Sequence, residues 1–420
     1  MSYHPLVDSA AVLALTAATV GFTLPASWLR IALLPVVGSL TWHCLLNCPV
    51  HIERSAWASA IGGFTISSFL HYLDVAVLNG WSFDIRGPSR DLVKGETTAP
   101  PPGGLNSPDI GDSAMESRRW SHLPAERIRF GLAVFFSWRF VNTPYQAKNL
   151  PRLDETLKTS RSRFLSQTAL TVVGCYLLLD IMSSSSDPNV SARFYTPDKV
   201  GVFSRLPELS IEELLMRFFA AAGSCAGLIA FQRGVYSLVA FACVVMWLSN
   251  PGDWPPFNGP LRQTYTLRSF WSTFWHQINT HRLSSLASFL VHHVLRLQRG
   301  TQLVRYLRIW LIFLFSGVQH VAIDLASGIP LQHSGAMRFF WIQPMGLVME
   351  DLVSSLYNAR SNGVARPLKR WQRCLCWVWV GLWMSWTAPA YLYPIMTLET
   401  SESGGVVPVS FIGYVRRLFD

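Results

Sequence analysis

Charged residues are scarce in this chain. Asp, Glu, Lys and Arg make up 14% of its 420 residues, whereas 50% of the residues are hydrophobic and 17 are tryptophan. An ordinary soluble domain carries about 25% charged residues. The composition therefore argues against an ordinary soluble protein and predicts an integral membrane protein.

The sequence also lacks the short motifs of several enzyme classes. It contains no HExxH, GxSxG, Walker or GxGxxG pattern, so metalloprotease, serine hydrolase and nucleotide-binding functions have no support. Its seven cysteines lie mostly in apolar segments, and Cys374 with Cys376 has neither zinc-site spacing nor histidine partners nearby. We expect no metal site and interpret the cysteines as small buried hydrophobic residues.

Long apolar stretches are abundant by contrast. Each approaches the ~20 residues needed to cross the hydrocarbon core, and each must satisfy its own backbone inside lipid, so we expect helices rather than strands. Nine such stretches lie at about 9–24, 30–47, 56–79, 164–182, 212–231, 234–249, 302–323, 335–357 and 371–396. The fold class predicted is all-α, a polytopic helical membrane bundle of about nine transmembrane helices.

The organisation predicted is one integral membrane domain over residues 1–420. The first apolar run has no Lys or Arg before it, so we expect it to be retained rather than cleaved as a signal peptide. Residues 285–296 are shorter and carry two histidines, which leaves open a tenth, tilted or re-entrant element. Residues 94–113 are rich in Pro, Gly, Ser and acids and are predicted to form a flexible loop.

The formal net charge of +10 indicates an anionic partner. Nucleic acid, anionic lipid and an anionic cofactor would all satisfy it, and the hydropathy makes nucleic acid the weakest of the three. We therefore predict a lipid bilayer as a partner and no nucleic acid.

Residues 250–284 form the least ordinary segment, predicted to be re-entrant or interfacial. A Pro and Gly cluster ends the preceding helix, and a helix can restart near Thr266. On that helix, positions four residues apart pair into a broad aromatic face. The residues of this face are Phe270, Phe274, Trp271 and Trp275.

His320 is almost the only titratable group in the apolar run 310–328. An ionisable residue at such depth is costly and is a functional candidate that faces the bundle interior. A neutral imidazole has one nitrogen free to accept a proton, as a general base requires. The alternative is a core histidine bonded to a carbonyl. Asp324 shares its helical face and is predicted either to orient the imidazole or to meet the aqueous interface.

His276 is the second candidate. With Gln277 and Asn279 it supplies hydrogen-bonding groups beside the aromatic wall, suited to polarising a carbonyl or holding an acceptor hydroxyl. The alternative is an interfacial aromatic belt with wetted polar residues.

These elements, in order, resemble the membrane-bound O-acyltransferases, in particular the fungal branch similar to plant wax synthases. The series is "WPP" at 254–256, "LRSFWSTFWHQ" at 267–277 and "SGVQH" at 316–320. Upstream, "HYLDVAVLNGWSFD" and "NTPYQAKNLP" look like two further blocks, so the likeness covers about residues 65–330. It differs at two points. The family often has Asn after the Trp where this chain has His276, and the "GIG" that often precedes "TPW" in this branch is absent, since the sequence reads "RFVNTPYQ".

The resemblance implies a bundle around a central reaction chamber, with His320 as the catalytic residue. It implies acyl transfer from acyl-CoA to an alcohol in the endoplasmic reticulum, most often acetyl transfer from acetyl-CoA to a hydroxyl of a terpenoid, meroterpenoid or related secondary metabolite. Acetyl-CoA would be a co-substrate, and no permanently bound cofactor is expected. We expect the aromatic face to line the substrate site and nearby cations to meet the CoA phosphates. Those cations are Arg262, Arg268 and Arg282.

Three alternatives remain open at this point. A wax-ester or sterol-ester synthase would use a long acyl donor, and the length of the tunnel would decide between the donors. A transporter would use His320, Glu350 and Asp351 along a polar path, although the two halves show no paired broken helices. An inactive scaffold is the third. The sequence carries no signal for an oligomeric state.

Overall fold

The computed structural model describes residues 3–85, 87, 124–185, 187–360, 368–399 and 405–419. The predicted loop 94–113 lies outside these ranges. The regular elements within them are helical. The α-helices are α1 Pro5–Phe22, α2 Leu29–Ala32, α3 Leu34–His51, α4 Ser55–Tyr72, α6 Pro124–Phe136, α7 Glu155–Thr159, α8 Arg161–Ser184, α9 Pro188–Phe194, α10 Ile211–Val245, α11 Leu267–Ser269, α12 Thr280–Phe289, α13 Gln302–Ala326, α14 Ala336–Arg360, α15 Arg370–Thr387, α16 Pro389–Glu399 and α17 Phe411–Phe419. Three π-helices, Leu73–Leu78, Phe270–Phe274 and Leu290–Val294, extend α4, α11 and α12.

Six helices of the described ranges are long and apolar enough to cross a membrane: Pro5–Phe22, Leu29–His51, Ser55–Leu78, Arg161–Ser184, Ile211–Val245 and Gln302–Ala326. They coincide with predicted stretches, so the all-α membrane class is confirmed. The predicted number of nine is not.

The differences have local physical causes. The predicted stretches 212–231 and 234–249 form one helix, α10, because Gln232 and Arg233 are good helix formers and Gly234 alone does not end a helix. At 35 residues α10 is about 50 Å long, more than the ~30 Å hydrocarbon core. The stretch 371–396 is divided at Pro389, which has no N–H to continue the hydrogen-bond ladder of α15.

The predicted stretch 335–357 does form a helix, α14. It is not among the six, because Arg338, Glu350 and Asp351 lower its hydropathy. The stretch 285–296 is not a separate span, since it is divided between α12 and the π-helix Leu290–Val294.

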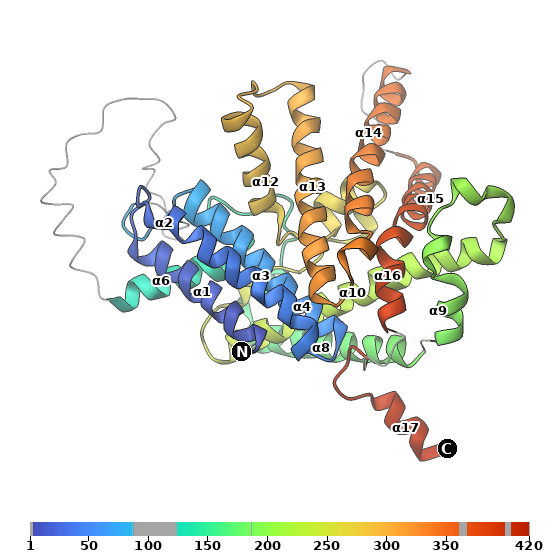
Figure 1. Cartoon of the computed structure of the whole chain (residues 1–420), viewed down its shortest axis with the longest axis horizontal. Coiled ribbons are helices and arrows are strands. Elements are labelled where there is room, and N and C mark those ends of the chain that lie inside the picture. Colours follow the sequence, from blue (N-terminus) through green and yellow to red (C-terminus); the bar gives the residue numbers. More distant parts are fainter. Residues whose placement is uncertain are drawn as a thin grey trace, which may run out of the picture.

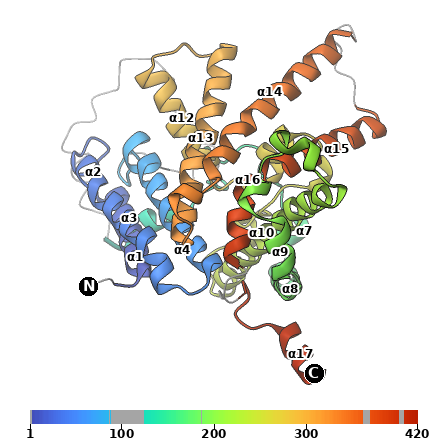
Figure 2. The same ribbon diagram turned by 45° about the vertical axis from the view of Figure 1, so that its right-hand side comes forward.

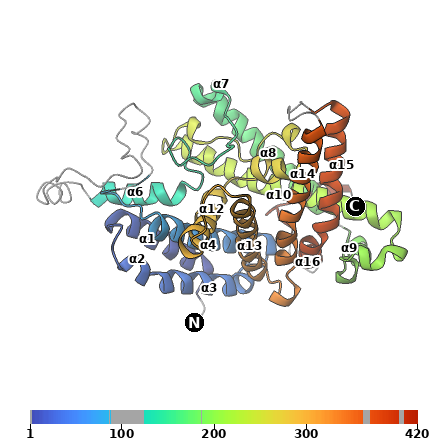
Figure 3. The same ribbon diagram turned by 90° about the horizontal axis from the view of Figure 1, so that it is seen from above.

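Helix α13, which carries His320, occupies the middle of the molecule. The N-terminal helices α1, α3 and α4 lie on one side of it, whereas α14, α15 and α16 lie on the other (Figures 1 and 3). Helix α12 packs against α13, and the two stand next to each other at the top of Figure 1. Turning the molecule shows α14 passing obliquely from α13 toward α15 (Figure 2).

Close helix contact fixes α13 against α4. A Cβ added at Gly62 would lie 2.2 Å from the Cβ of Ala326, so only glycine permits this approach. The Gln319 side chain donates a 2.8 Å hydrogen bond to Ser67 Oγ across the same interface. On its other side α13 contributes Phe313 to a core with Phe339 and Phe340 of α14. These contacts determine which way the histidine of α13 points.

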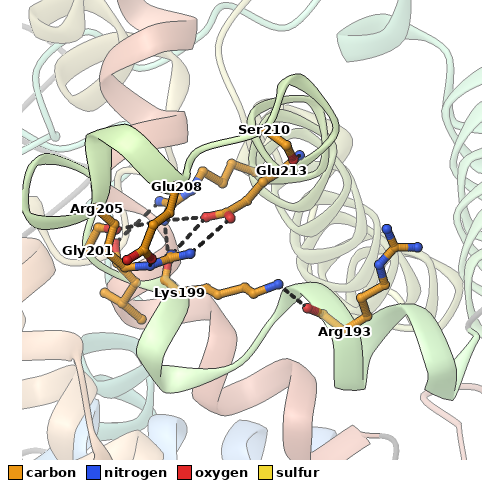
Figure 4. Close-up of polar contacts among 9 residues, drawn as sticks. Arg193, Lys199, Gly201, Arg205, Glu208, Ser210 and Glu213 are labelled. Carbon is orange, nitrogen blue, oxygen red and sulfur yellow. Dashed lines mark hydrogen bonds and ion pairs between the residues drawn. The ribbon is translucent and has the colours of Figure 1, made fainter.

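A polar cluster secures the start of α10 (Figure 4). The Glu213 carboxylate, 4% exposed, accepts 3.1 Å and 3.3 Å hydrogen bonds from the Arg205 guanidinium. Arg217, 1% exposed, donates to the Lys199 carbonyl, which belongs to the connector that precedes α10. Since each charge meets an opposite charge or a carbonyl, we assign this cluster a structural role.

Candidate active site

Hydrogen bonds from other parts of the chain fix the Pro-rich part of residues 250–284. The Arg139 guanidinium, 5% exposed, donates to the carbonyls of Pro255 and Pro256 at 2.9 and 2.8 Å. The Gly259 N–H donates to the Phe274 carbonyl at 3.0 Å, which joins the Pro-rich stretch to the aromatic run. An irregular backbone is tolerated at membrane depth only where protein groups satisfy it in this way.

The helix restart near Thr266 is confirmed. The Thr266 side chain accepts from the Ser269 N–H at 3.0 Å and caps α11. The α-helix then gives way to a π-helix at Phe270–Phe274. This wider turn stacks the rings of Phe270 and Trp275, five positions apart, at 5.5 Å. The predicted pairs at four positions also form, with Trp271 and Trp275 6.1 Å apart.

Glu350 of α14 anchors the start of this aromatic run. Its carboxylate accepts from the backbone N–H groups of Leu267 at 2.5 Å and Arg268 at 3.0 Å. The Trp379 indole of α15 donates to the same carboxylate at 3.1 Å. These bonds occupy the carboxylate with backbone and indole donors, so they do not favour the polar transport path considered for Glu350.

A continuous series of aromatic contacts joins the two candidate histidines. Trp275 lies 5.4 Å from the His276 ring. Trp271, next to Trp275, lies 6.1 Å from Phe340 of α14, and Phe340 lies 4.2 Å from the His320 ring. The fold therefore brings the aromatic run and α13 together, although His276 and His320 are 44 positions apart in the sequence.

The geometry of His320 defines its free nitrogen. Its Nδ1 lies 2.7 Å from the Ser316 carbonyl, which can only accept, so Nδ1 carries the proton. In a neutral imidazole Nε2 is then unprotonated and able to accept a proton. Asp324 does not supply this orientation, because its carboxylate accepts a 2.6 Å bond from Ser334 Oγ at the end of α13. The orienting role predicted for Asp324 is thus taken by a backbone carbonyl.

His276 is half-buried and neutral. Burial lowers the pKa of His276 to about 3. Its Nδ1 is buried without a partner in the described part of the chain, and the same holds for Trp271 Nε1 and Asn279 Oδ1. Buried polar atoms are usually satisfied, and each one left unpaired costs about 1–3 kcal/mol. Three such atoms close together in the sequence indicate a place where a ligand completes the hydrogen bonds.

Gln277 plays a different part from the one predicted. Its side-chain amide donates to the carbonyls of Ser272 at 3.0 Å and Trp275 at 2.9 Å, and its oxygen accepts from Thr280 at 2.9 Å. All three bonds are local to the turn after the π-helix. Gln277 therefore shapes this turn and has little left to offer a substrate.

The three arginines predicted to meet the CoA phosphates are placed differently from one another. Arg282 is 1% exposed and donates to the carbonyls of Ser67 and Ile278, so it is sequestered. Arg268 pairs with Asp351 at 2.6 Å. Arg262 lies exposed on a 3-10 turn, Leu261–Gln263. The contacts of the described residues give the three arginines no partner in common.

A cavity of about 600 Å³ between the 144–148 segment and α12 holds another set of cations. Hydroxyls and cationic or titratable groups line much of its wall, and none of its lining residues is acidic: Lys148, Arg299, Arg308, His281, His292, His293, Thr280, Ser284, Ser285 and Ser288 are among them. Arg308 Nε is buried without a partner in the described ranges. Such a surface suits an anion. Sequence reasoning missed this set because its members come from separate segments.

Neither His276 nor His320 lines this cavity. Its wall includes Thr280 and His281, the first residues of α12, which follow His276 by only a few positions. The site thus combines a polar cleft with two half-buried imidazoles beside the aromatic run. This arrangement is what acid–base chemistry in a membrane-embedded enzyme requires, with room for an anionic reactant beside it.

Comparison with known proteins agrees with this class. Residues 254–342, which include both histidines, match the model of the membrane bound O-acyl transferase family. The chain is also 31% identical to acetyltransferase aurG of Calcarisporium arbuscula, over 91% of this chain and 90% of that protein. The chain therefore belongs to the membrane bound O-acyl transferase family and is an O-acyltransferase, as the sequence resemblance predicted.

Further relatives carry the same type of name. Acetyltransferase fsoF of Humicola fuscoatra is 27% identical over 96% of this chain and 99% of its own length. Acetyltransferase ataH of Aspergillus terreus is 34% identical over 66% of this chain and 93% of its own length. No solved structure matches the chain.

Proposed function

We propose that the chain transfers an acetyl group from acetyl-CoA to a hydroxyl of a terpenoid, meroterpenoid or related fungal secondary metabolite, in the endoplasmic reticulum membrane. The observation that carries the chemistry is the tautomer of His320, with Nδ1–H bound to the Ser316 carbonyl and Nε2 free. The names of the relatives support acetyl as the group transferred.

The reaction proposed is a direct transfer. His320 Nε2 takes the proton of the acceptor hydroxyl as its oxygen attacks the thioester carbon. The carbon–sulfur bond breaks, and the proton then passes to the CoA thiolate, so that the products are the ester and CoA. His276, neutral because its pKa is lowered to about 3, donates to the carbonyl oxygen as negative charge develops on it.

The cleft beside α12 is the proposed site of the donor's phosphates. CoA carries several negative charges, and the cleft offers Lys148, Arg299 and Arg308 without an opposing carboxylate. Arg can bind phosphate through two parallel N–H bonds. The cleft replaces the set of Arg262, Arg268 and Arg282, of which Arg282 is sequestered and Arg268 is paired.

Labelled acetyl-CoA and palmitoyl-CoA, supplied to membranes that contain the protein with a panel of terpenoid and fatty alcohols, test this proposal. We expect label in a terpenoid ester from acetyl-CoA and a loss of at least 10³-fold for His320→Gln. His333→Gln, a change of an exposed histidine at the α13–α14 connection, is the matched control and should retain full activity. Transfer only from palmitoyl-CoA would refute the donor, and equal activity of His320→Gln would refute the mechanism.

A further inference from the structure

A buried carboxylate holds one histidine of the cleft. His281 Nδ1 lies 2.6 Å from Asp74 Oδ2, and Asp74, in the π-helix Leu73–Leu78 that extends α4, is 0% exposed. The other oxygen of Asp74 accepts from the Asn79 amide at 2.6 Å. Since a carboxylate at neutral pH only accepts, Nδ1 of His281 is the donor in this pair. Nε2 is the single polar atom of the ring that remains available.

Two aromatic rings fix the imidazole further. Phe140 meets the His281 ring edge to face at 4.6 Å, and Trp81 lies 5.9 Å away, both with 0% exposure. The His281 side chain is nevertheless 19% exposed, and it lines the cleft. Asp74 binds one nitrogen of the His281 ring, and Phe140 packs against the ring. The remaining edge of the imidazole therefore faces the cleft.

We infer that Asp74 is a positioning residue for the acyl donor, which holds His281 so that its Nε2–H binds a phosphate group of the CoA nucleotide. This inference rests on the proposed function, which makes acyl-CoA the donor. When a phosphate binds, a proton taken up with it at Nε2 completes a chain of carboxylate, imidazole ring and phosphate, in which both ring N–H groups donate to an anion. Asp74 does not touch the reacting atoms, and it acts through the orientation of His281.

The pair links the two halves of the sequence functionally. Asp74 belongs to the block 71–84, whereas His281 is the second residue of α12, the helix that follows the aromatic run. A substrate contact made through both would explain why these distant segments meet at the cleft. Lys148, Arg299 and Arg308 neutralise charge there, and the fixed imidazole adds a donor in a defined direction.

The test uses the purified full-length protein in nanodiscs, with acetyl-CoA and with acetyl-pantetheine, which lacks all phosphates. For Asp74→Asn we expect the KM for acetyl-CoA to rise about tenfold and kcat to change less than twofold. The KM for acetyl-pantetheine should not change. If Asp74→Asn fails to fold, His281→Gln serves as the test instead, because the glutamine amide still donates to the buried carboxylate. It should show the same rise in the KM for acetyl-CoA. Asp8→Asn is the matched control, because Asp8 is equally buried and holds His43 at 2.8 Å elsewhere.

Three outcomes would overturn the inference. The first is an unchanged KM for acetyl-CoA in a folded Asp74→Asn variant, and the second is an equal rise for acetyl-pantetheine. The third is that phosphatidylinositol competes with CoA for the wild-type protein in nanodiscs but not for the Asp74→Asn variant. This result would assign the site to a lipid headgroup. The Kd of CoA, measured directly by tryptophan quenching, tests the pair independently of turnover. Absence of any transfer by the wild type would count against the proposed function instead.

Discussion

Replacing Glu350 by Gln should weaken the anchor of the aromatic run. One carboxylate oxygen accepts from the Leu267 N–H and the Trp379 indole, and the other accepts from the Arg268 N–H. A glutamine retains one oxygen, so its NH₂ group must face a donor at the other position. One charge-assisted bond, about 1.5–3 kcal/mol, is lost, and a backbone N–H is left unsatisfied. We expect the free energy of unfolding to fall by about 3 kcal/mol.

The neighbouring residue provides the control. Asp351 binds Arg268 and Arg305, whose side chains are 36% and 48% exposed. Ion pairs with such exposure contribute about 0.2–1 kcal/mol each, so Asp351→Asn, which loses two of them, should cost about 2 kcal/mol or less. Unfolding by denaturing detergent, followed by tryptophan fluorescence, measures both variants. Equal losses for Glu350→Gln and Asp351→Asn would refute the anchoring role of Glu350.

Two further substitutions examine the segment directly. A Cβ at Gly259 would lie 2.1 Å from the Thr273 carbonyl oxygen. Gly259→Ala should therefore separate the Pro-rich stretch from the π-helix and reduce acetyl transfer at least tenfold. Gly252 has open space around it, so Gly252→Ala is the control and should leave transfer unchanged. His276→Asn should retain most of the activity that His276→Ala loses, because the imidazole acts as a neutral donor. Since the pKa of His276 is lowered to about 3, the protonated form is absent above about pH 5, and pH–rate profiles of wild type and His276→Asn should coincide from there to about pH 8.

Hydropathy predicted the membrane class because lipid imposes one rule on every span. Hydropathy overcounted the spans because it does not show whether one helix continues from one apolar stretch into the next. Residues 232 and 233 indicate a break between two predicted spans, yet the backbone cost of continuing the helix there is small and α10 runs through them. Pro389 was the opposite case, because a proline without a backbone N–H ends the helix within a single apolar stretch.

The candidate histidines were predictable for a similar reason. A buried titratable group is costly, so His320 stands out in an apolar helix whatever its neighbours are. Its hydrogen-bond partner was not predictable, because Ser316 and Asp324 both share its helical face and only the packing chooses between them. The π-turn at Phe270–Phe274 was also missed, since sequence periodicity assumes the regular helix. The cations of the cleft are contributed by distant segments, and no local pattern identifies them.

The polar residues around the aromatic run divide into two groups by what they bind. One group hydrogen-bonds to backbone N–H and C=O groups of the irregular segment 250–284, and it consists of Arg139, Gln277 and Glu350. Their chemistry looks functional in the sequence, but a buried segment without regular helix needs such partners for its backbone N–H and C=O groups. His276 and Asn279 stay unpaired in the described residues although the same segment surrounds them. Because the fold satisfies its own backbone so fully here, the atoms that it leaves unsatisfied are those available to the reactants.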